Sequence, residues 1–230
     1  MLGVLAFGDS ITNGGGELLW GVALQSWALW VARALGMPYT GYAEDGATAP
    51  DVLERQIAAH RVAQPDARYD VGCLYIGTND VRALDWDPDG FARDYSKAVA
   101  YLRERCERVL CVTIPLDLGR PRAGAKVEEA NRIIEAAGTH VVDLRRFRGR
   151  RLLMTDHVHP TAFGQLAIAE RALDVLAADG VPVRVRPSAL VSYETTWWGC
   201  LRGDAAYAYR HAKVSLRSAA IVAAVRAGLL

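Results

Sequence analysis

The chain has 230 residues, enough for one full α/β domain with an appendage. Apolar residues make up 51% of the chain and charged residues 23%, proportions that exclude large-scale disorder. Because 27 basic residues stand against 26 acidic ones, the net charge of +1 gives no reason to expect a nucleic-acid partner.

The cysteines and the apolar runs limit the expected cofactors and compartment. The four cysteines lack the spacing of a zinc site, and three lie in apolar, strand-like segments, so we predict free thiols and no metal or organic cofactor. No apolar run reaches the length of a membrane span, and the closest, residues 18–35, is predicted to be a buried helix. A polar turn already stands at position 10, which leaves no room for a leader before it, so a cytoplasmic location is expected.

The first predicted strand, Val4–Gly8, is apolar throughout and runs into Asp9 and Ser10. Apolar strands of this kind are typical of sheets covered on both faces, and ligands collect beyond the carboxyl ends of such strands. Serine is also a common cap and turn residue. The position of Ser10 therefore suggests a nucleophile but does not establish one.

Helices and strands alternate through the next 170 residues. Further strands are predicted at residues 39–43, 70–76, 109–114 and 140–144. Helices are predicted within residues 18–35 and at 49–60, 88–105, 126–137 and 161–178. Such alternation predicts parallel strands joined by right-handed crossovers, in a three-layer α/β/α sandwich with a five-stranded sheet.

A change in composition follows this body. The extended, proline-bracketed segment Val181–Pro187 suggests a boundary near residue 187, which gives a domain of residues 1–187 and a C-terminal helical extension of residues 188–230. An aromatic turn that includes 197–199 precedes a helix predicted from about Asp204 to Ala227. One side of that helix carries Tyr207, Val214, Ile221 and Val225, and another carries Arg210, Lys213 and Arg217. Docking on the body or on a second copy, as in a homodimer, is the favoured interpretation, and a helix on a membrane surface is the alternative.

Polar groups follow four of the predicted elements. They are Gly8-Asp9-Ser10, Gly46, Gly77-Thr78-Asn79-Asp80 and Asp156-His157-Val158-His159. This set resembles the four sequence blocks of the SGNH, or GDSL, hydrolase family, over residues 3 to about 178. The resemblance implies a flavodoxin-like sheet order and a serine acylhydrolase. The extension beyond residue 187 lies outside it.

The chemistry expected of these residues can also be argued without the family. A serine hydroxyl needs a base, and an imidazole with an ordinary pKa of about 6.5 takes its proton near neutrality. His159 is the predicted base and Asp156 its orienting acid, with His157 as the competing base. The resemblance favours His159, and activity is expected to fall below about pH 6 as it protonates.

The resemblance also implies an oxyanion hole made by the Ser10 N–H, the Gly46 N–H and the Asn79 side-chain amide. Asp9 and Asp80 are expected to support these loops, Asp80 as a cap or an orienting group. Each of these residues also suits an ordinary turn.

Two other motifs are incomplete in this sequence, and one arginine-rich segment is a candidate binding surface. The serine lacks the second glycine of G-x-S-x-G, and residues 14–16 lack the G-K-[ST] of a phosphate loop. Residues 145–151 hold five arginines, usually a solvated face, but Arg145, Arg146 or Arg148 is a candidate contact for an anionic substrate group.

The sequence therefore predicts hydrolysis of a small carboxylic ester, with a carbohydrate-linked one as a candidate, through an acyl-enzyme on Ser10. An acyltransferase that uses the same intermediate with another acceptor is the first alternative. A non-catalytic binding protein on the same scaffold is the second.

Overall fold

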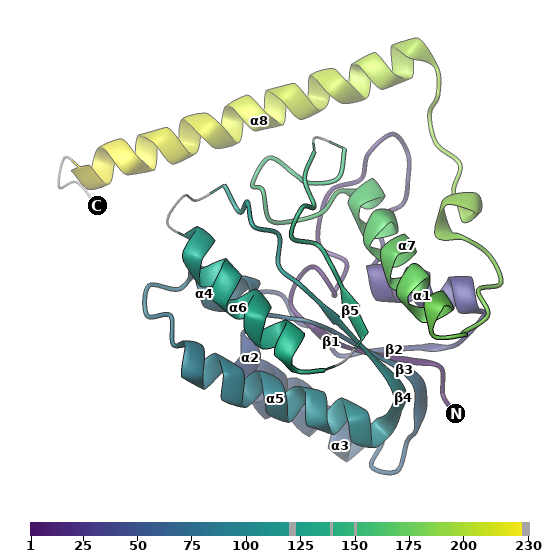
Figure 1. Cartoon of the computed structure of the whole chain (residues 1–230). Coiled ribbons are helices and arrows are strands. Elements are labelled where there is room, and N and C mark those ends of the chain that lie inside the picture. The colour runs from purple at the N-terminus through teal and green to yellow at the C-terminus, as the bar shows by residue number, and fades with distance from the viewer. Residues whose placement is uncertain (120–122, 139, 150, 227–230) are drawn as a thin grey trace.

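A five-stranded parallel sheet runs through the centre of the molecule (Figure 1). The computed structural model describes residues 1–119, 123–138, 140–149 and 151–226. The strand order is β2-β1-β3-β4-β5. The strands are β1 (Val4–Gly8), β2 (Tyr39–Gly41), β3 (Tyr69–Tyr75), β4 (Cys106–Val112) and β5 (His140–Val142). The predicted parallel sheet with a flavodoxin-like order is confirmed.

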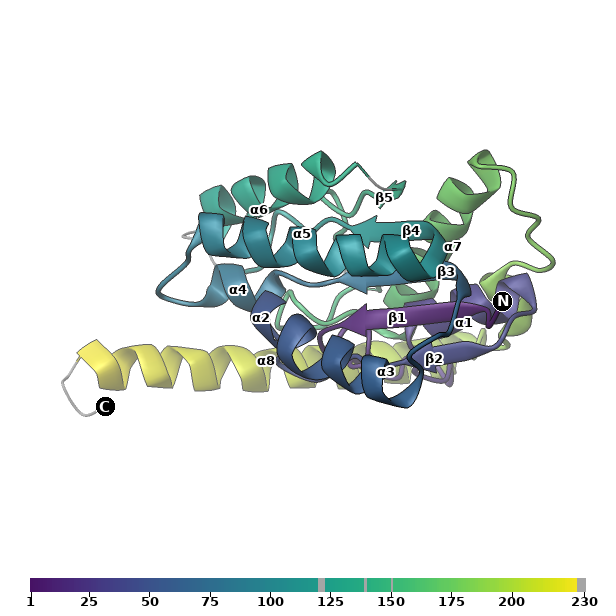
Figure 2. The same cartoon turned by 90° about the horizontal axis from the view of Figure 1, so that it is seen from below.

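Helices cover both faces of the sheet, which confirms the predicted three layers (Figures 1 and 2). One face packs against α1 (Trp27–Leu35) and α7 (Ala162–Ala178), and these two helices contact each other. The other face carries the run α2 (Ala49–Asp51), η1 (Val52–Ile57) and α3 (Ala58–Ala63), together with α5 (Pro88–Arg105) and α6 (Gly124–Ala136). The short α4 (Thr78–Arg82) follows β3.

The strand order indicates at which edge of the sheet a ligand site is expected. The chain leaves β1 toward β2 on one side of the sheet and returns to β3 on the other, so the connections diverge between β1 and β3. In open α/β sheets ligands bind at such a point, beyond the carboxyl ends of the strands. Ser10 follows β1 and Asn79 follows β3, so both stand at this edge.

Side-chain caps set where several helices begin. The Ser26 hydroxyl accepts a hydrogen bond from the Ala28 N–H at the start of α1, and the Thr161 hydroxyl accepts from the Gly164 N–H at the start of α7. The helix predicted within residues 18–35 is shorter in the structure, where it begins at Trp27. Trp20 and Gly21 have φ angles of +52° and +81°, which a right-handed helix does not allow.

The helix predicted over residues 49–60 has an irregularity that the sequence does not reveal. Residues Val52–Ile57 form a π-helical segment between α2 and α3. One extra residue in such a turn redirects the side chains around it, and π-bulges occur often at functional sites. Here the side chain of Gln56 reaches the end of β1.

The C-terminal extension begins with the 3-10 helix η3 (Pro187–Leu190) and ends in the long α8 (Trp197–Arg226). Helix α8 starts seven residues earlier than predicted, because the Thr196 hydroxyl accepts from the Gly199 N–H and the 197–199 segment becomes helical rather than a turn. Its predicted end at Ala227, and the side chains of Val214, Arg217, Ile221 and Val225, lie outside what the structure describes. No helix in the described part of the chain is long and apolar enough to cross a membrane.

Helix α8 crosses the end of the molecule where the loops after β1 and β5 lie (Figure 1). Arg210 forms an ion pair with Glu17, and Gly203 lies against the indole of Trp20. The Glu194 N–H donates to the Trp20 carbonyl at 2.9 Å, ahead of the helix. The extension is thus fixed to the loop that follows Ser10.

The thiols are as predicted for three of the four cysteines. Within the described residues no cysteine forms a disulfide, and Cys73, Cys106 and Cys111 are buried whereas Cys200 on α8 is half-buried. Burial raises the pKa of the Cys106 thiol to about 12, so this thiol stays protonated and packs as a small apolar group.

Candidate active site

Ser10, His159 and Asp156 form a continuous chain of hydrogen bonds at the carboxyl edge of the sheet. The Ser10 Oγ lies 2.9 Å from the His159 Nε2, and the His159 Nδ1 lies 2.6 Å from the Asp156 Oδ2. An ionised Asp156 can only accept, so the Nδ1 carries the proton and the Nε2 is free to accept from the serine. This is the arrangement that turns a hydroxyl into a nucleophile.

A tight turn holds the acid and the base together. The Asp156 Oδ1 accepts from the N–H groups of Val158 and His159 at 2.9 and 3.0 Å, and the Met154 N–H donates to the His159 carbonyl at 2.8 Å. His157, the competing base, has a φ of +60°, and its Nδ1 lies 3.9 Å from the Asp117 Oδ1. The structure therefore places His159, and not His157, against Ser10.

The same contacts shift the pKa values of both partners. The hydrogen bond to Asp156 raises the pKa of His159 above its ordinary value, although burial opposes this. Burial would raise the pKa of Asp156, but the hydrogen bonds from the His159 ring and the two backbone N–H groups outweigh it and lower that pKa. Asp156 is therefore ionised across the range in which His159 titrates.

The two remaining blocks flank the serine with potential oxyanion donors. Gly46 has a φ of +77°, a conformation that favours glycine, and its N–H donates to no group within the described residues. The Asn79 Nδ2 donates to the Ala47 carbonyl at 2.9 Å, which uses one amide hydrogen and leaves the second available. These features suit donors held ready for a negative oxygen.

Hydrogen bonds join the loops into one framework. The Asn13 Nδ2 donates to the Asp45 Oδ1 at 2.9 Å, which links the Ser10 turn to the Gly46 loop. The Ala49 N–H donates to the Asp80 Oδ1 at 3.0 Å, which links that loop to the Asn79 block. Asp80 thus joins two of these loops, its orienting role stays a prediction, and burial raises its pKa to about 6.

Two buried glutamines that the motif analysis did not select hold the Ser10 turn from both sides. Gln56 accepts from the Gly8 N–H at 2.9 Å and donates to the Gly8 carbonyl at 2.8 Å. Gln165 on α7 donates to the carbonyls of Ile11 and Gly15 at 2.9 and 3.1 Å and accepts from the Trp27 N–H at 2.8 Å. Their signal in the sequence is a polar residue at a position of a helix where the neighbours on the same face are apolar.

Asp9 is almost fully buried beside Ser10. Its Oδ1 accepts from the Ile11 N–H at 2.9 Å, whereas its Oδ2 has no partner within the described residues. Burial raises the pKa of Asp9 to about 7, although the Ile11 N–H and the nearby His159 act in the opposite direction. The folded protein therefore holds a proton that the unfolded chain, with an aspartate pKa near 4, releases.

This proton makes stability depend on pH. Its contribution is complete below the unfolded pKa and is lost as the pH rises through about 7. The variant Asp9→Asn has no titrating group at this position. Between pH 5 and pH 8 the free energy of unfolding of wild type should therefore fall by on the order of 2 kcal/mol relative to that of the variant. Urea unfolding at both pH values measures the difference. Equal pH dependence in the two proteins would contradict a protonated Asp9.

The arginine-rich segment resolves into separate roles. Arg145 pairs with Asp143 and Glu135 at 2.8 and 2.9 Å, so its charge is already compensated. Arg151 stacks on the Trp20 ring, with its guanidinium carbon 4.3 Å from the ring centroid. Arg146 and Arg148 are exposed, and Arg150 lies outside the described residues. Of the three candidate anion contacts, Arg148 lines a cavity of about 210 Å³.

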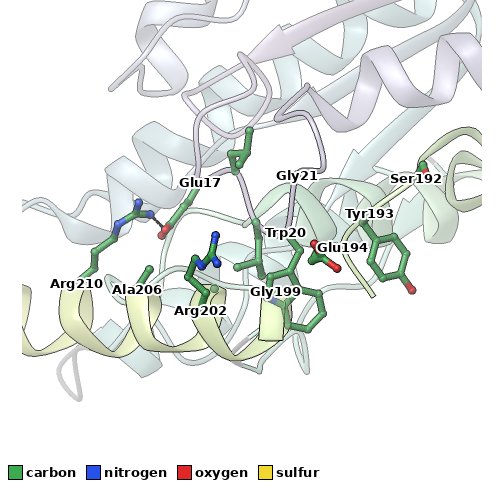
Figure 3. A pocket seen from close by; sticks show the side chains of 13 residues that line it. Glu17, Trp20, Gly21, Ser192, Tyr193, Glu194, Gly199, Arg202, Ala206 and Arg210 are labelled. Atoms are coloured by element: carbon green, nitrogen blue, oxygen red, sulfur yellow. Dashed lines mark ion pairs between the residues drawn. The ribbon is translucent and has the colours of Figure 1, made fainter. Parts of the chain in front are cut away.

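Two cavities lie where α8 meets the loop after Ser10 and the turn that carries His159. The larger, about 580 Å³, is lined by residues that include Glu17, Trp20, Tyr193, Arg202 and Arg210 (Figure 3). Its Glu17 and Arg210 side chains point toward each other and form an ion pair. The smaller, about 210 Å³, is lined by Arg148 and His157 among others.

The four blocks lie within a match to a known protein family. The model of the GDSL-like Lipase/Acylhydrolase family matches residues 6–167, a span that contains all four blocks. The chain belongs to this family. A search of curated proteins found no match.

Solved structures agree with the fold of this family. A variant of Axe2, an acetyl xylan esterase from Geobacillus stearothermophilus, has a TM-score of 0.58 at 20% identity, covering 75% of this chain and 93% of that one. LAE5, an alpha/beta hydrolase enzyme from the metagenome of Lake Arreo in Spain, has a TM-score of 0.59 at 21% identity, covering 76% and 94%. At this identity the likeness concerns the fold. Members of the family are typically serine esterases.

Proposed function

We propose that the protein hydrolyses a carboxylic ester through an acyl-enzyme on Ser10. The observation that carries the proposal is the unbroken hydrogen-bond chain from the Ser10 Oγ through the His159 ring to the Asp156 carboxylate. Membership of an acylhydrolase family supports it. The chemistry needs a nucleophile, a base and an oxyanion hole, and residues for each meet at one edge of the sheet.

The reaction follows from the positions of the protons. The His159 Nε2 takes the proton of the Ser10 hydroxyl as the Oγ attacks the acyl carbon, and the Asp156 carboxylate stabilises the imidazolium. Donors from Ser10, Gly46 and Asn79 meet the negative oxygen of the tetrahedral intermediate. The imidazolium then gives its proton to the leaving alcohol. Water, deprotonated by His159, releases the acid and restores the serine.

A short acyl group, with acetyl esters of carbohydrates as first candidates, is the substrate class that we infer. Axe2 is an acetyl xylan esterase, and its catalytic mutants replace a serine, an aspartate or a histidine. The replaced aspartate and histidine of Axe2 are three positions apart, as Asp156 and His159 are. This correspondence supports the same division of roles in the present chain.

A panel of esters tests the proposal directly. Acyl esters from acetyl to long chain, acetylated sugars and a thioester would be supplied to the wild-type protein, and free acid would be measured. We expect the highest kcat/KM on acetyl esters. Added acceptor alcohols should not divert the acyl group, and a transfer product in place of free acid would show an acyltransferase instead. Hydrolysis of none of these esters would overturn the proposal.

The pH profile gives a second test. The base must be neutral, and because Asp156 raises the pKa of His159 above its ordinary 6.5, activity should fall as the pH drops through a value above 6.5. This places the acidic limb higher than the pH 6 expected from the sequence. Initial rates at saturating and at low substrate between pH 5 and pH 9 measure it. A profile that stays flat down to pH 5 would contradict the role of His159.

A further inference from the structure

The smaller cavity, here called the Arg148 cavity, adjoins the catalytic turn. Its lining includes Met154 and His157 from that turn, Asp117 from the loop after β4, Arg148, and Tyr207 from α8. The Met154 N–H is bonded to the His159 carbonyl at 2.8 Å. Two peptide units separate His157 from His159, so their Cα atoms are at most about 7.6 Å apart. The cavity is therefore close to the base.

Asp117 and Arg148 are the two charged side chains that line this cavity. The Asp117 Oδ1 accepts from the Gly119 N–H at 2.9 Å and lies 3.9 Å from the His157 Nδ1, so this carboxylate is engaged locally. Arg148 is exposed and pairs with no carboxylate among the residues that the structure describes. In the larger cavity, by contrast, Arg210 is paired with Glu17. The Arg148 guanidinium is thus a cation of the smaller cavity that has no carboxylate partner among the described residues.

His157 is held at the cavity by its backbone and by Gly119. Its φ of +60° is unusual for a residue with a side chain, and such conformations persist where the surrounding structure enforces them. Gly119 has a φ of +66°, and a Cβ there would come within 3.1 Å of the His157 side chain. The imidazole therefore lies against Gly119 and lines the cavity together with Arg148.

The course of the reaction shows which part of the substrate would reach this cavity. His159 must protonate the oxygen of the leaving alcohol, so the alcohol lies on the histidine side of Ser10. The oxyanion candidates Gly46 and Asn79 come from the loops after β2 and β3 instead. Because the Arg148 cavity shares a wall with the His159 turn, it adjoins the space for the alcohol rather than the acyl group.

We propose that the Arg148 cavity binds an anionic group, a carboxylate or a phosphate, on the alcohol part of the ester. The planar guanidinium of Arg148 offers paired donors that match either group, and the His157 ring closes one side. The inference rests on the proposed esterase function and adds a preference among its substrates. It also assigns α8 a part in that preference, because Tyr207 completes the cavity wall.

Two acetyl esters that differ in charge test the inference. The substrates are 4-acetoxybenzoate, whose alcohol part carries a carboxylate, and its neutral methyl ester. The measured quantity is the ratio of their kcat/KM values, which cancels their intrinsic difference when variants are compared. We expect Arg148→Ala to lower this ratio about tenfold, as loss of a charge-assisted hydrogen bond would. Raised ionic strength should lower the ratio in wild type and leave it unchanged in the variant.

Arg146→Ala is the matched control. It removes the same charge at a position two residues from Arg148, and the Arg146 side chain does not line the cavity. Its ratio should stay within about twofold of wild type, since a general surface potential is largely screened at working ionic strength. An equal fall in both variants would overturn the inference, and so would an unchanged ratio in Arg148→Ala.

Inorganic phosphate distinguishes a substrate group from a free anion. Phosphate should compete with 4-acetoxybenzoate in wild type and lose this effect in Arg148→Ala. Phosphate binding that depends on Arg148 together with an unchanged substrate ratio would overturn the assignment to the substrate. A wild type that hydrolyses neither these two esters nor any ester of the panel would overturn the proposed function as well, whereas an active wild type with an unaltered ratio would overturn this inference alone.

Discussion

Replacement of Ser10 by alanine should lower kcat/KM by about 10⁴-fold or more, because the nucleophile and the route through the acyl-enzyme are both lost. The Ser10 Oγ lies 2.9 Å from the His159 Nε2. Another hydroxyl could take its place only if the His159 ring moved. The activity that remains would come from binding and from the oxyanion donors, which act without the serine. Ester hydrolysis with the best substrate of the panel measures the effect.

Two comparisons make this result specific. Ser96→Ala removes a hydroxyl from an exposed position of α5 and should keep wild-type activity. Because Ser10 and His159 act as one unit, the double variant Ser10→Ala/His159→Ala should be no slower than the worse single variant. A fluorophosphonate should label wild type and Ser96→Ala but not Ser10→Ala. Retention of more than a hundredth of the activity in Ser10→Ala would rule out the serine as nucleophile.

Replacement of Gln165 by leucine is expected to lower the free energy of unfolding by about 3 to 5 kcal/mol, because it leaves buried main-chain groups without partners. The side chain is fully buried and serves three of them, the carbonyls of Ile11 and Gly15 and the N–H of Trp27. Leucine has a similar volume, so the loss comes from hydrogen bonding rather than from a cavity. Urea unfolding measures it.

Gln64→Leu is the control for this change. Gln64 is half-buried, and its side-chain oxygen accepts from the Tyr69 hydroxyl, so its loss should cost about 1 kcal/mol or less. Gln165→Leu should also lower the fraction of protein that a fluorophosphonate labels under folding conditions, because the turn that carries Ser10 loses one of its two supports. A stability within 1 kcal/mol of wild type would contradict this account of Gln165.

The fold was largely predictable because its signals are local. Apolar strands bounded by glycines, and helices with recognisable caps such as Thr161, alternate along the body in the pattern of a parallel sheet. The errors occur where tertiary contacts override local preference. The π-helical segment at Val52–Ile57 places Gln56 on Gly8, which no pattern within the helix reveals. Helix α8 is an exception with a local cause: it begins at Trp197 because Thr196 caps a segment whose glycine and aromatic residues suggest a turn.

The site divides in the same way. Ser10, Asp156 and His159 were predicted because their chemistry requires particular residue types after particular strands, and the structure brings these three together. The arginine-rich segment could not be resolved in advance. The ion-pair partners that set Arg145 apart from Arg148 are Asp143 and Glu135, and the packing of α6 near β5 decides which arginine they meet. The roles of the catalytic residues, the homodimer and the cytoplasmic location stay predictions.

The turn that holds Asp156 and His159 determines which of the three hydrogen-bonded residues keep their alignment when one segment is displaced. Asp156 and His159 are three residues apart and are joined by side-chain and backbone hydrogen bonds, so they form one local unit. The serine belongs to a separate segment, held by Gln56 and Gln165. A displacement of either segment would open the gap between Ser10 and His159 while the histidine keeps its proton on Nδ1. In such a displaced form the proposed base would be correctly polarised but would have no hydroxyl to deprotonate, and realigning the two segments would restore the hydrogen bond between Ser10 and His159.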